Sequence, residues 1–405
     1  MKRIYEALIQ EHLQKYQQML FVSGPRRIGK TTISLEGEDL TKNFLYLNWD
    51  NQKHRQIITT GGEEIPNLLN LDKLQTKKST KPIIVFDEIH KYRKWKNFLK
   101  GFFDTFGEQT NIIVTGSAKL NIFIKGGDSL MGRYFPYRIH PFSVAECIST
   151  DLIKKEIREP KLIEPKVFQA LFNFGGFPEP FIKKDQSFFN RWKRLRKEQL
   201  FREDIRDLTR IQESSQLEIL AELIRQQAGQ LVSYSNLANK VNVSIDTISR
   251  WIKTLNAFYY CFTIKPWTKN ISRSLLKEPK IYLWDWSDID DVGAKAENFV
   301  ASHLLKAVHF WTDRGLGDYE LYFLRDKEKR EVDFLVTKNN KPWFIVEVKN
   351  SSNVALSKNL FVFQKQTGAP HAFQVAFNME PVIQNCFAHH KPIIVPVQTL
   401  LSQLV

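Results

Sequence analysis

Short apolar runs that end in polar residues recur along the first third of the chain. They span residues 19–22, 44–47, 83–86 and 112–114. Strands buried on both faces of a parallel sheet have continuous apolar runs of this kind rather than strict alternation. We therefore predict an α/β fold with a parallel sheet for this region, with a short helix within residues 1–18 packed beside it.

A glycine-rich segment follows the first apolar run. Residues 24–31 match the pattern GxxxxGK[ST] at every fixed position. In this pattern, backbone N–H groups of the loop surround phosphates, the Lys reaches the β- and γ-phosphates, and the hydroxyl binds Mg²⁺. The alternative is a chance Gly/Lys loop. The sequence predicts an ATP and Mg²⁺ site with Thr31 as a metal ligand and these nucleotide-binding residues: Gly24, Pro25, Arg26, Arg27, Ile28, Gly29, Lys30, Thr31 and Thr32.

Polar residues at the ends of later runs are candidates for the same site. Asp87 is predicted to hold Mg²⁺, and Glu88 to act as the general base that polarises the attacking water. Thr115 or Ser117, after the fourth run, is a candidate sensor of the γ-phosphate, whereas the alternative for Ser117 is a helix cap. Arg133 is a candidate nucleotide contact, in its own site or across a subunit interface, and otherwise a salt-bridge residue.

Helical spacing dominates the middle of the chain. Residues 188–208 predict a basic amphipathic helix whose charged face meets either solvent or a phosphate backbone, with Leu195 on the apolar face. Residues 217–255 indicate three helices, and residues 259–265 a strand. This succession is the outline of a winged helix.

The third of these helices is the candidate for contact with DNA. Its apolar positions face inward and leave Arg250 and Lys253 for solvent or a major groove. Winged helices also bind proteins, so DNA and protein partners both stay open. A GGFPEP cluster at residues 175–180 predicts a turn before the basic helix.

Charged residues lie within apolar strands in the last third of the chain. Glu347 and Lys349 share one strand face, because strand side chains alternate with a period of two. Asp333, on the preceding antiparallel strand, is predicted to lie beside Glu347. These carboxylates and the Val348 carbonyl predict a second Mg²⁺ site, with Glu297 completing it and Lys349 as its catalytic residue. The alternative is a cross-strand salt-bridge cluster.

Composition adds a polyanionic partner to these expectations. The formal charge of +15 favours nucleic acid. The three cysteines lie far apart and indicate neither a disulfide framework nor a zinc site. No signal peptide or membrane-spanning run is recognisable, so we expect no membrane partner and a cytoplasmic location.

Several segments together resemble a prokaryotic AAA-type ATPase family with an uncharacterised C-terminal region. They are GPRRIGKTT, IIVFDEIHKYRKWKNFLK, IIVTGSAK, GRYFPYRIHPFSVAE, GGFPE and EVDFLV...FIVEVKN. The resemblance implies a P-loop ATPase domain over residues 1–150, a helical and winged-helix region over 151–270, and a restriction-endonuclease-like α/β domain over 271–405. Asp333, Glu347 and Lys349 occupy the positions of the PD-(D/E)XK nuclease core, with Glu297 as its helical acid.

Two function classes follow from these expectations. One is an ATP-hydrolysing enzyme whose C-terminal nuclease-like site acts on DNA with Mg²⁺. The other is a nucleotide-switched module that binds DNA or protein through an inactive nuclease fold. A homo-oligomer stays open in both.

Overall fold

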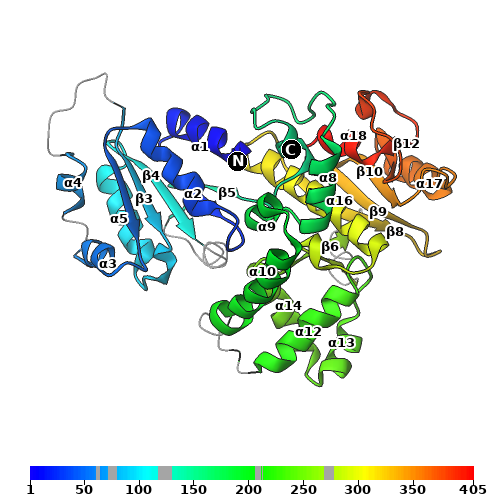
Figure 1. Cartoon of the computed structure of the whole chain (residues 1–405), viewed down its shortest axis with the longest axis horizontal. Helices are drawn as coiled ribbons and strands as arrows, with labels where there is room; N and C mark the ends of the chain where they lie inside the picture. The colour runs from blue at the N-terminus through cyan, green and yellow to red at the C-terminus, as the bar shows by residue number, and fades with distance from the viewer. Residues whose placement is uncertain (61–63, 72–79, 117–129, 206–210, 212, 269–277) are drawn as a thin grey trace. The chain divides into compact units, whose positions relative to one another are not determined.

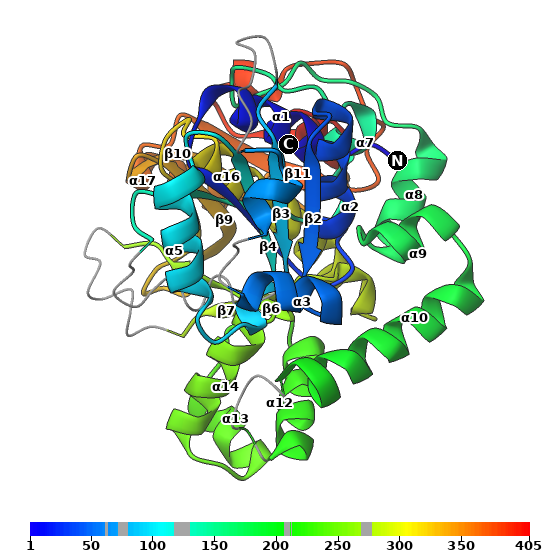
Figure 2. The ribbon, with the colours of Figure 1, turned by 90° about the vertical axis from the view of Figure 1, so that its left-hand side faces the viewer.

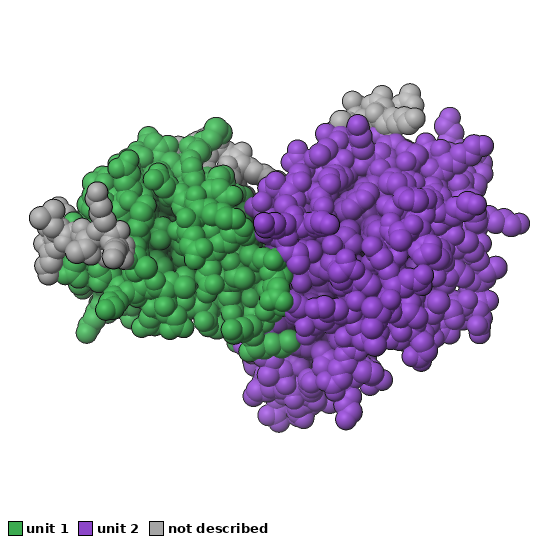
Figure 3. Space-filling view, turned by 90° about the horizontal axis from the view of Figure 1, so that it is seen from above, with its two compact units in different colours: residues 1–140, 150–152 green, residues 141–149, 153–405 purple. Residues whose placement is uncertain are grey.

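A computed structural model describes residues 1–60, 64–71, 80–116, 130–205, 211, 213–268 and 278–405. These residues form two compact units (Figure 1 and, coloured by unit, Figure 3). Unit 1 contains residues 1–140 and 150–152, and unit 2 contains residues 141–149 and 153–405. The division between the two units therefore does not fall at a single position of the sequence.

Unit 1 contains a five-stranded sheet in the order β2-β3-β4-β1-β5, and every neighbouring pair is parallel. The α/β class predicted from the apolar runs is confirmed. The strands are β1 (Met19–Ser23), β2 (Phe44–Asn48), β3 (Ile83–Asp87), β4 (Asn111–Gly116) and β5 (Tyr134–Arg138). The helices are α1 (Ile4–Lys15), α2 (Lys30–Leu35), α3 (Gln52–Thr59), α4 (Ile65–Leu68) and α5 (Trp95–Phe106), with 3₁₀ turns at Glu36–Leu40 and Ile89–Lys91.

Helices cover both faces of this sheet, with α2 and α5 on opposite faces (Figures 1 and 2). Phe86 and Val114 of the sheet pack with Trp95, Leu99 and Phe102 of α5 in one apolar core. Every residue of β1 and β3 is buried. Continuous burial explains why these strands appear in the sequence as unbroken apolar runs.

Unit 2 is built on a seven-stranded mixed sheet in the order β12-β11-β10-β9-β8-β6-β7. Strands β8, β9 and β10 are antiparallel neighbours, whereas β10, β11 and β12 are parallel. The strands are β6 (Cys261–Pro266), β7 (Lys280–Leu283), β8 (Tyr319–Arg325), β9 (Glu331–Lys338), β10 (Lys341–Lys349), β11 (His371–Ala376) and β12 (Ile393–Pro396). The long helix α16 (Val292–Asp313) packs against β7, β8, β9 and β10.

The remaining helices of unit 2 precede or flank this sheet. Before it come α7 (Val144–Ile148), α8 (Pro165–Phe174), α9 (Pro178–Lys183), α10 (Gln186–Glu198), a π-helical turn (Gln199–Ile205), α12 (Ser214–Gln226), α13 (Tyr234–Val241) and α14 (Ile245–Ala257). Between or after its strands lie α17 (Lys358–Thr367), α18 (Val397–Ser402) and 3₁₀ turns at Trp286–Asp288 and Cys386–Ala388. The three predicted helices before the strand at residue 259 are thus present as α12, α13 and α14.

The strand that follows these helices belongs to the large sheet. β6 pairs antiparallel with β7 and parallel with β8. The boundary expected at residue 270 therefore falls between two paired strands of one sheet, within one compact unit. Sequence patterning did not indicate this pairing, because partners in a sheet are chosen by tertiary packing.

The GGFPEP cluster forms the predicted turn between α8 and α9. Gly175 has φ of +79°, a backbone conformation that favours glycine. A Cβ atom at Gly176 would lie 2.6 Å from the Phe142 carbonyl oxygen and 2.7 Å from the Trp286 ring. The indole N–H of Trp286 donates to the Leu171 carbonyl, 3.0 Å away. The two glycines therefore allow the α8–α9 corner to contact the segment after β7.

Candidate functional site

The phosphate-binding loop predicted at residues 24–31 joins β1 to α2. Gly29, the residue before α2, has φ of +95° and ψ of 18°, which favours glycine. A Cβ at Gly24 would lie 2.6 Å from the Ile139 carbonyl oxygen. The two glycines of the motif are therefore required by backbone shape and by close packing.

Lys30 lies inside this loop. Its ammonium group donates to the carbonyl oxygens of Gly24, 3.1 Å away, and Pro25, 2.8 Å away. Arg3, which sequence reasoning missed, donates to the carbonyl oxygens of Ile28 at 3.1 Å and of His140 at 2.6 Å. Arg3 is buried and thus holds the loop against the end of β5. It gave no signal in the sequence, because its partners lie 25 and 137 residues away.

Asp87 is the meeting point of several hydroxyl groups. Thr31 donates to its Oδ2 at 3.0 Å and Tyr46 donates to the same oxygen at 2.6 Å. Thr115 donates to Oδ1. Two predicted Mg²⁺ ligands, Thr31 and Asp87, are therefore neighbours, and the candidate sensor Thr115 contacts Asp87 as well.

Tyr46 was not predicted to be part of this group. It lies on β2, whose end pairs with the end of β3, with Asn48 beside Asp87. Burial and the hydrogen bond to Asp87 raise the pKa of Tyr46, so its hydroxyl remains a donor. The side-chain amide of Asn48 donates to the Tyr46 oxygen at 3.1 Å and orients it.

Glu88 follows Asp87 with φ of +56° in the left-handed region. Its Oε2 lies 3.5 Å from Nε2 of His90 and 3.8 Å from Nζ of Lys91. Burial raises the pKa of the Glu88 carboxyl, although the nearby Lys30 ammonium acts in the opposite direction. A carboxylate with a raised pKa is a better proton acceptor than an ordinary one.

Two other predicted nucleotide contacts have different outcomes. Ser117 lies outside the described residues. Arg133 precedes β5, and its carbonyl accepts from Met19 N at the start of β1, whereas the phosphate-binding loop follows the end of β1. Its guanidinium is 2.6 Å from Asp104 of α5. Because β1 and β5 are parallel, Arg133 lies at the opposite end of the strands from the loop of its own chain. We therefore correct the prediction that Arg133 contacts the nucleotide site of its own chain. Contact across a subunit interface stays a prediction.

A second group of charged side chains lies in unit 2. Val346 pairs with Phe334, so the next pair in the β9–β10 register is Glu347 and Asp333. Asp333 Oδ2 accepts a hydrogen bond from Val348 N at 2.8 Å, and Lys349 Nζ lies 2.8 Å from Glu347 Oε1. The Glu347 Oε2 atom is buried and has no hydrogen-bond partner among the described residues.

Lys280 of β7 lies among the carboxylates of this group. Its Nζ is 2.7 Å from Glu331, 3.2 Å from Glu297 and 3.7 Å from Asp333. The Tyr282 hydroxyl donates to Glu297 at 2.7 Å. Among the described residues, no three His, Cys, Asp or Glu side chains are arranged to hold a metal ion. We define Lys280, Glu297, Glu331, Asp333, Glu347 and Lys349 as the acidic cluster.

The acidic cluster perturbs the titration of its members. Burial and the neighbouring Glu297 raise the pKa of Asp333 to about 7, although Lys280 and the N–H of Val348 lower it. Burial lowers the pKa of Lys280, but the charges of Glu297, Asp333 and Glu331 outweigh it, so the net shift is upward. Lys280 and Tyr282 share one strand face, a period-two signal that could have identified them as companions of Glu297.

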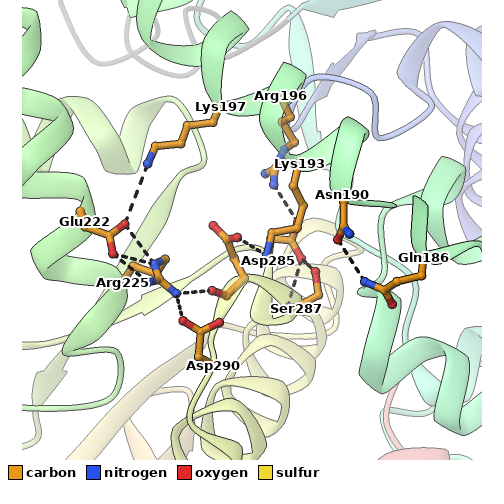
Figure 4. A network of polar contacts seen from close by, with 11 residues as sticks. Gln186, Asn190, Lys193, Arg196, Lys197, Glu222, Arg225, Asp285, Ser287 and Asp290 are labelled. Carbon is orange, nitrogen blue, oxygen red and sulfur yellow. Dashed lines mark hydrogen bonds and ion pairs between the residues drawn. The ribbon is translucent and has the colours of Figure 1, made fainter. Parts of the chain in front are cut away.

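The basic helix α10 directs part of its charge toward acids of unit 2 (Figure 4). Its buried apolar residues are Phe189 and Trp192, whereas Leu195, predicted to face inward, is half exposed. Three basic side chains form ion pairs: Lys193 with Asp288 at 2.6 Å, Arg196 with Asp285 at 2.8 Å and Lys197 with Glu222 at 3.9 Å. These pairs leave less of the helix for a phosphate backbone than the sequence predicted.

The third helix of the α12–α14 cluster presents the predicted face. Ser244 accepts from the backbone N–H of Thr247 and caps α14. Ile248, Ile252 and Leu255 are buried, as their spacing predicted, and Trp251 is buried with them. Arg250 and Lys253 are exposed. No helix of the described residues is long and apolar enough to cross a membrane.

The phosphate-binding loop lies in a part of the chain that matches a known family model. Residues 16–148 match a family model described as an AAA domain. The N-terminal part of the chain is therefore similar to AAA domains. Residues 166–287 and 292–393 match two models described as domains of unknown function, DUF8612 and DUF4143. The AAA model contains the loop, Asp87 and Glu88, whereas the acidic cluster is divided between the other two models.

Two relatives described as uncharacterized proteins match this chain over more than half of their own length. An uncharacterized protein of Methanocaldococcus jannaschii is 25% identical over 342 residues, which are 79% of this chain and 72% of the relative. An uncharacterized protein of Haemophilus influenzae is 23% identical over 252 residues, 59% of this chain and 60% of the relative.

Two solved structures match with low scores. The Aeropyrum pernix ORC1 protein in complex with DNA has a TM-score of 0.33 and 14% identity, covering 74% of this chain and 94% of its own. AMPPCP-bound DnaA from Aquifex aeolicus has a TM-score of 0.31 and 14% identity, covering 62% of this chain and 86% of its own.

Proposed function

We propose that the AAA domain binds ATP with Mg²⁺ and hydrolyses it. The hydrogen bond between Thr31 and Asp87 carries this proposal, because it brings the two oxygen ligands expected for Mg²⁺ together beside the phosphate-binding loop. When bound, Mg²⁺ would neutralise charge on the β- and γ-phosphates. The oxygen-rich donors at this point suit that ion.

The other residues of the site have separate roles in the proposed reaction. Backbone N–H groups of the loop hold the phosphates, and the Lys30 ammonium leaves its carbonyl partners for the β- and γ-phosphate oxygens. Glu88 accepts a proton from water as the water attacks the γ-phosphate. Thr115 holds Asp87 in the orientation that leaves an oxygen for the metal.

ATP hydrolysis by the purified full-length protein tests this function. We expect turnover that requires Mg²⁺ and stops with excess EDTA. Lys30→Ala should abolish turnover and weaken nucleotide binding, since the ammonium proposed to contact the β- and γ-phosphates is lost. Lys42→Ala is the matched control, because Lys42 is an exposed lysine of the same unit. Equal hydrolysis by Lys30→Ala and wild-type protein would contradict the proposal.

The exposed face of α14 supports a second function, binding of duplex DNA. Arg250 and Lys253 are exposed on this helix, and the whole chain has a formal charge of +15. Of the two function classes, these observations favour a nucleotide-switched DNA-binding module. DNA cleavage is not part of the proposal, because the Lys280 ammonium lies among the carboxylates that would have to bind the metal.

A further inference from the structure

The acidic cluster has a cation supplied by the chain itself. Lys280 comes from β7, Glu297 from α16, and Glu331 and Asp333 from β9. The ammonium lies within 3.7 Å of all three carboxylates, and the Lys280 side chain is 4% exposed. A buried ammonium has three N–H donors, and three carboxylates from two elements surround this one.

We propose that Lys280 is the resident cation of the acidic cluster and blocks a latent divalent-metal site formed by Glu297, Glu331, Asp333 and Glu347. The cluster accepts a divalent ion when the Lys280 charge is removed. This inference is independent of ATP hydrolysis, because every residue in it belongs to unit 2.

The charges of the cluster support this competition. With all groups ionised, four carboxylates face three cations: Lys280, Lys349 and Arg325, which is 2.7 Å from Glu331. The formal charge is then −1. Without Lys280 it becomes −2, which one divalent ion would neutralise. Carboxylates this close together repel one another unless a cation lies between them.

The spacing of the cluster suits an ammonium rather than a metal ion. The Lys280 distances to Glu331 and Glu297 fall near the 2.7–3.2 Å range of N–H···O hydrogen bonds, whereas Mg²⁺ binds oxygen at about 2.0–2.1 Å. The distances therefore match hydrogen bonds to an ammonium, and no group of acids among the described residues is arranged to hold a metal ion.

Glu347 provides an observation that is independent of Lys280. The residue is 6% exposed, and its Oε2 has no hydrogen-bond partner among the described residues. A buried carboxylate oxygen without a donor is costly. It is therefore an available ligand beside Asp333, and Mn²⁺ or Mg²⁺ is the kind of ion that carboxylate oxygens select.

A calorimetric titration of the nucleotide-free full-length protein with Mn²⁺ tests the proposal. All variants carry Asp87→Asn, so that the AAA domain contributes no metal site. We expect no binding by this parent at millimolar Mn²⁺. We expect one new site in Lys280→Gln that binds Mn²⁺ at least about tenfold more tightly than any site of the parent. Adding Asp333→Asn should abolish the new site.

Two controls separate charge from packing. Lys280→Arg keeps the cation and should behave like the parent, as should Lys341→Gln, which removes an exposed lysine from the same unit. If Lys280→Gln does not fold, Lys280→Met replaces it, since it also removes the cation and keeps all four carboxylates, with the same new site expected. Two results would overturn the proposal. One is that the parent binds Mn²⁺ as well as Lys280→Gln does. The other is that neither Lys280→Gln nor its replacement gains a new site.

Discussion

At the scale of single residues, the proposed nucleotide site depends on how hydroxyl groups hold one carboxylate. Asp87 is 3% exposed, and three hydroxyls donate to it. Hydrogen bonds to a charged group contribute more than neutral ones, about 1.5–3 kcal/mol each. Asp87 is therefore held in place by residues of α2, β2 and β4 before any ligand arrives.

Glu88 and Asp87 are adjacent but should respond differently to substitution. We predict that Glu88→Gln retains ATP binding and lowers the rate of hydrolysis by about 10²–10⁴-fold, because only the proton acceptor is lost. Single-turnover hydrolysis and nucleotide titration measure the two effects. Glu108→Gln, which changes an exposed glutamate of unit 1, should leave both unchanged. A wild-type rate in Glu88→Gln would assign the base to another group.

Tyr46 should act on the metal through Asp87. We predict that Tyr46→Phe raises the Mg²⁺ concentration for half-maximal hydrolysis about tenfold, because groups that orient a metal ligand affect metal affinity by about that much or more. The rate at saturating Mg²⁺ should change less than the Mg²⁺ requirement. Tyr92→Phe is the control, because it also removes a tyrosine hydroxyl of unit 1. Its ring stacks on Trp49 with centroids 4.7 Å apart, and Phe retains that ring. An unchanged Mg²⁺ requirement in Tyr46→Phe would limit Tyr46 to a structural role.

At the scale of elements, two basic helices of unit 2 have different fates. Three basic side chains of α10 form ion pairs with acids of the same unit. Arg250 and Lys253 of α14 are exposed on a helix whose opposite side is buried. Both helices have basic side chains in the sequence. Only the structure shows which of these side chains form ion pairs within unit 2 and which are exposed on α14.

Exposure of α14 leads to a prediction on DNA affinity. Replacing Arg250 and Lys253 together by Gln should weaken duplex binding and lower the slope of log affinity against log salt by about 1.8, or 0.9 per lost phosphate contact. Fluorescence anisotropy over a series of salt concentrations measures the slope. Replacing Lys358 and Lys365, exposed lysines of α17, is the matched control. Equal slopes in wild type and the α14 variant would favour a protein partner for this helix.

At the scale of the whole molecule, the chain has two units with separate apolar cores. The unit 1 core contains Phe21, Phe86 and Trp95, and a core of unit 2 contains Leu335, Ile345 and Leu360. Unit 2 also contains a buried ion pair between Lys306 and Glu146, and Lys306 donates to the Pro141 carbonyl at 3.1 Å. Each unit should therefore respond to its own ligand or substitution.

Calorimetry of the full-length protein tests this separation. We predict that a non-hydrolysable ATP analogue with Mg²⁺ raises the midpoint of one unfolding transition, by about 2.7 kcal/mol of stability at 100 times the dissociation constant. Lys306→Met should lower the other transition by about 3–5 kcal/mol, because Glu146 loses its buried partner. Lys306→Met with Glu146→Leu should recover much of that loss. A single transition that responds to both changes would contradict independent units.

The sequence by itself determined the parts of this protein that depend on local pattern. Continuous apolar runs predicted the parallel sheet, and the spacing of one glycine-rich motif predicted the loop and Lys30. The 3.6-residue period of apolar residues predicted the buried face of α14. Each of these features follows from residues within a few positions of one another, so no knowledge of distant partners was needed.

Only the tertiary structure decided which distant residues meet. It brought Tyr46 to Asp87, placed Arg133 at the sheet edge away from the loop of its own chain, and joined β6 to β7 across the expected boundary. It also placed Lys280 among Glu297, Glu331 and Asp333. Strand order and register depend on packing over a whole sheet. A local sequence motif therefore does not indicate which distant strand it will pair with.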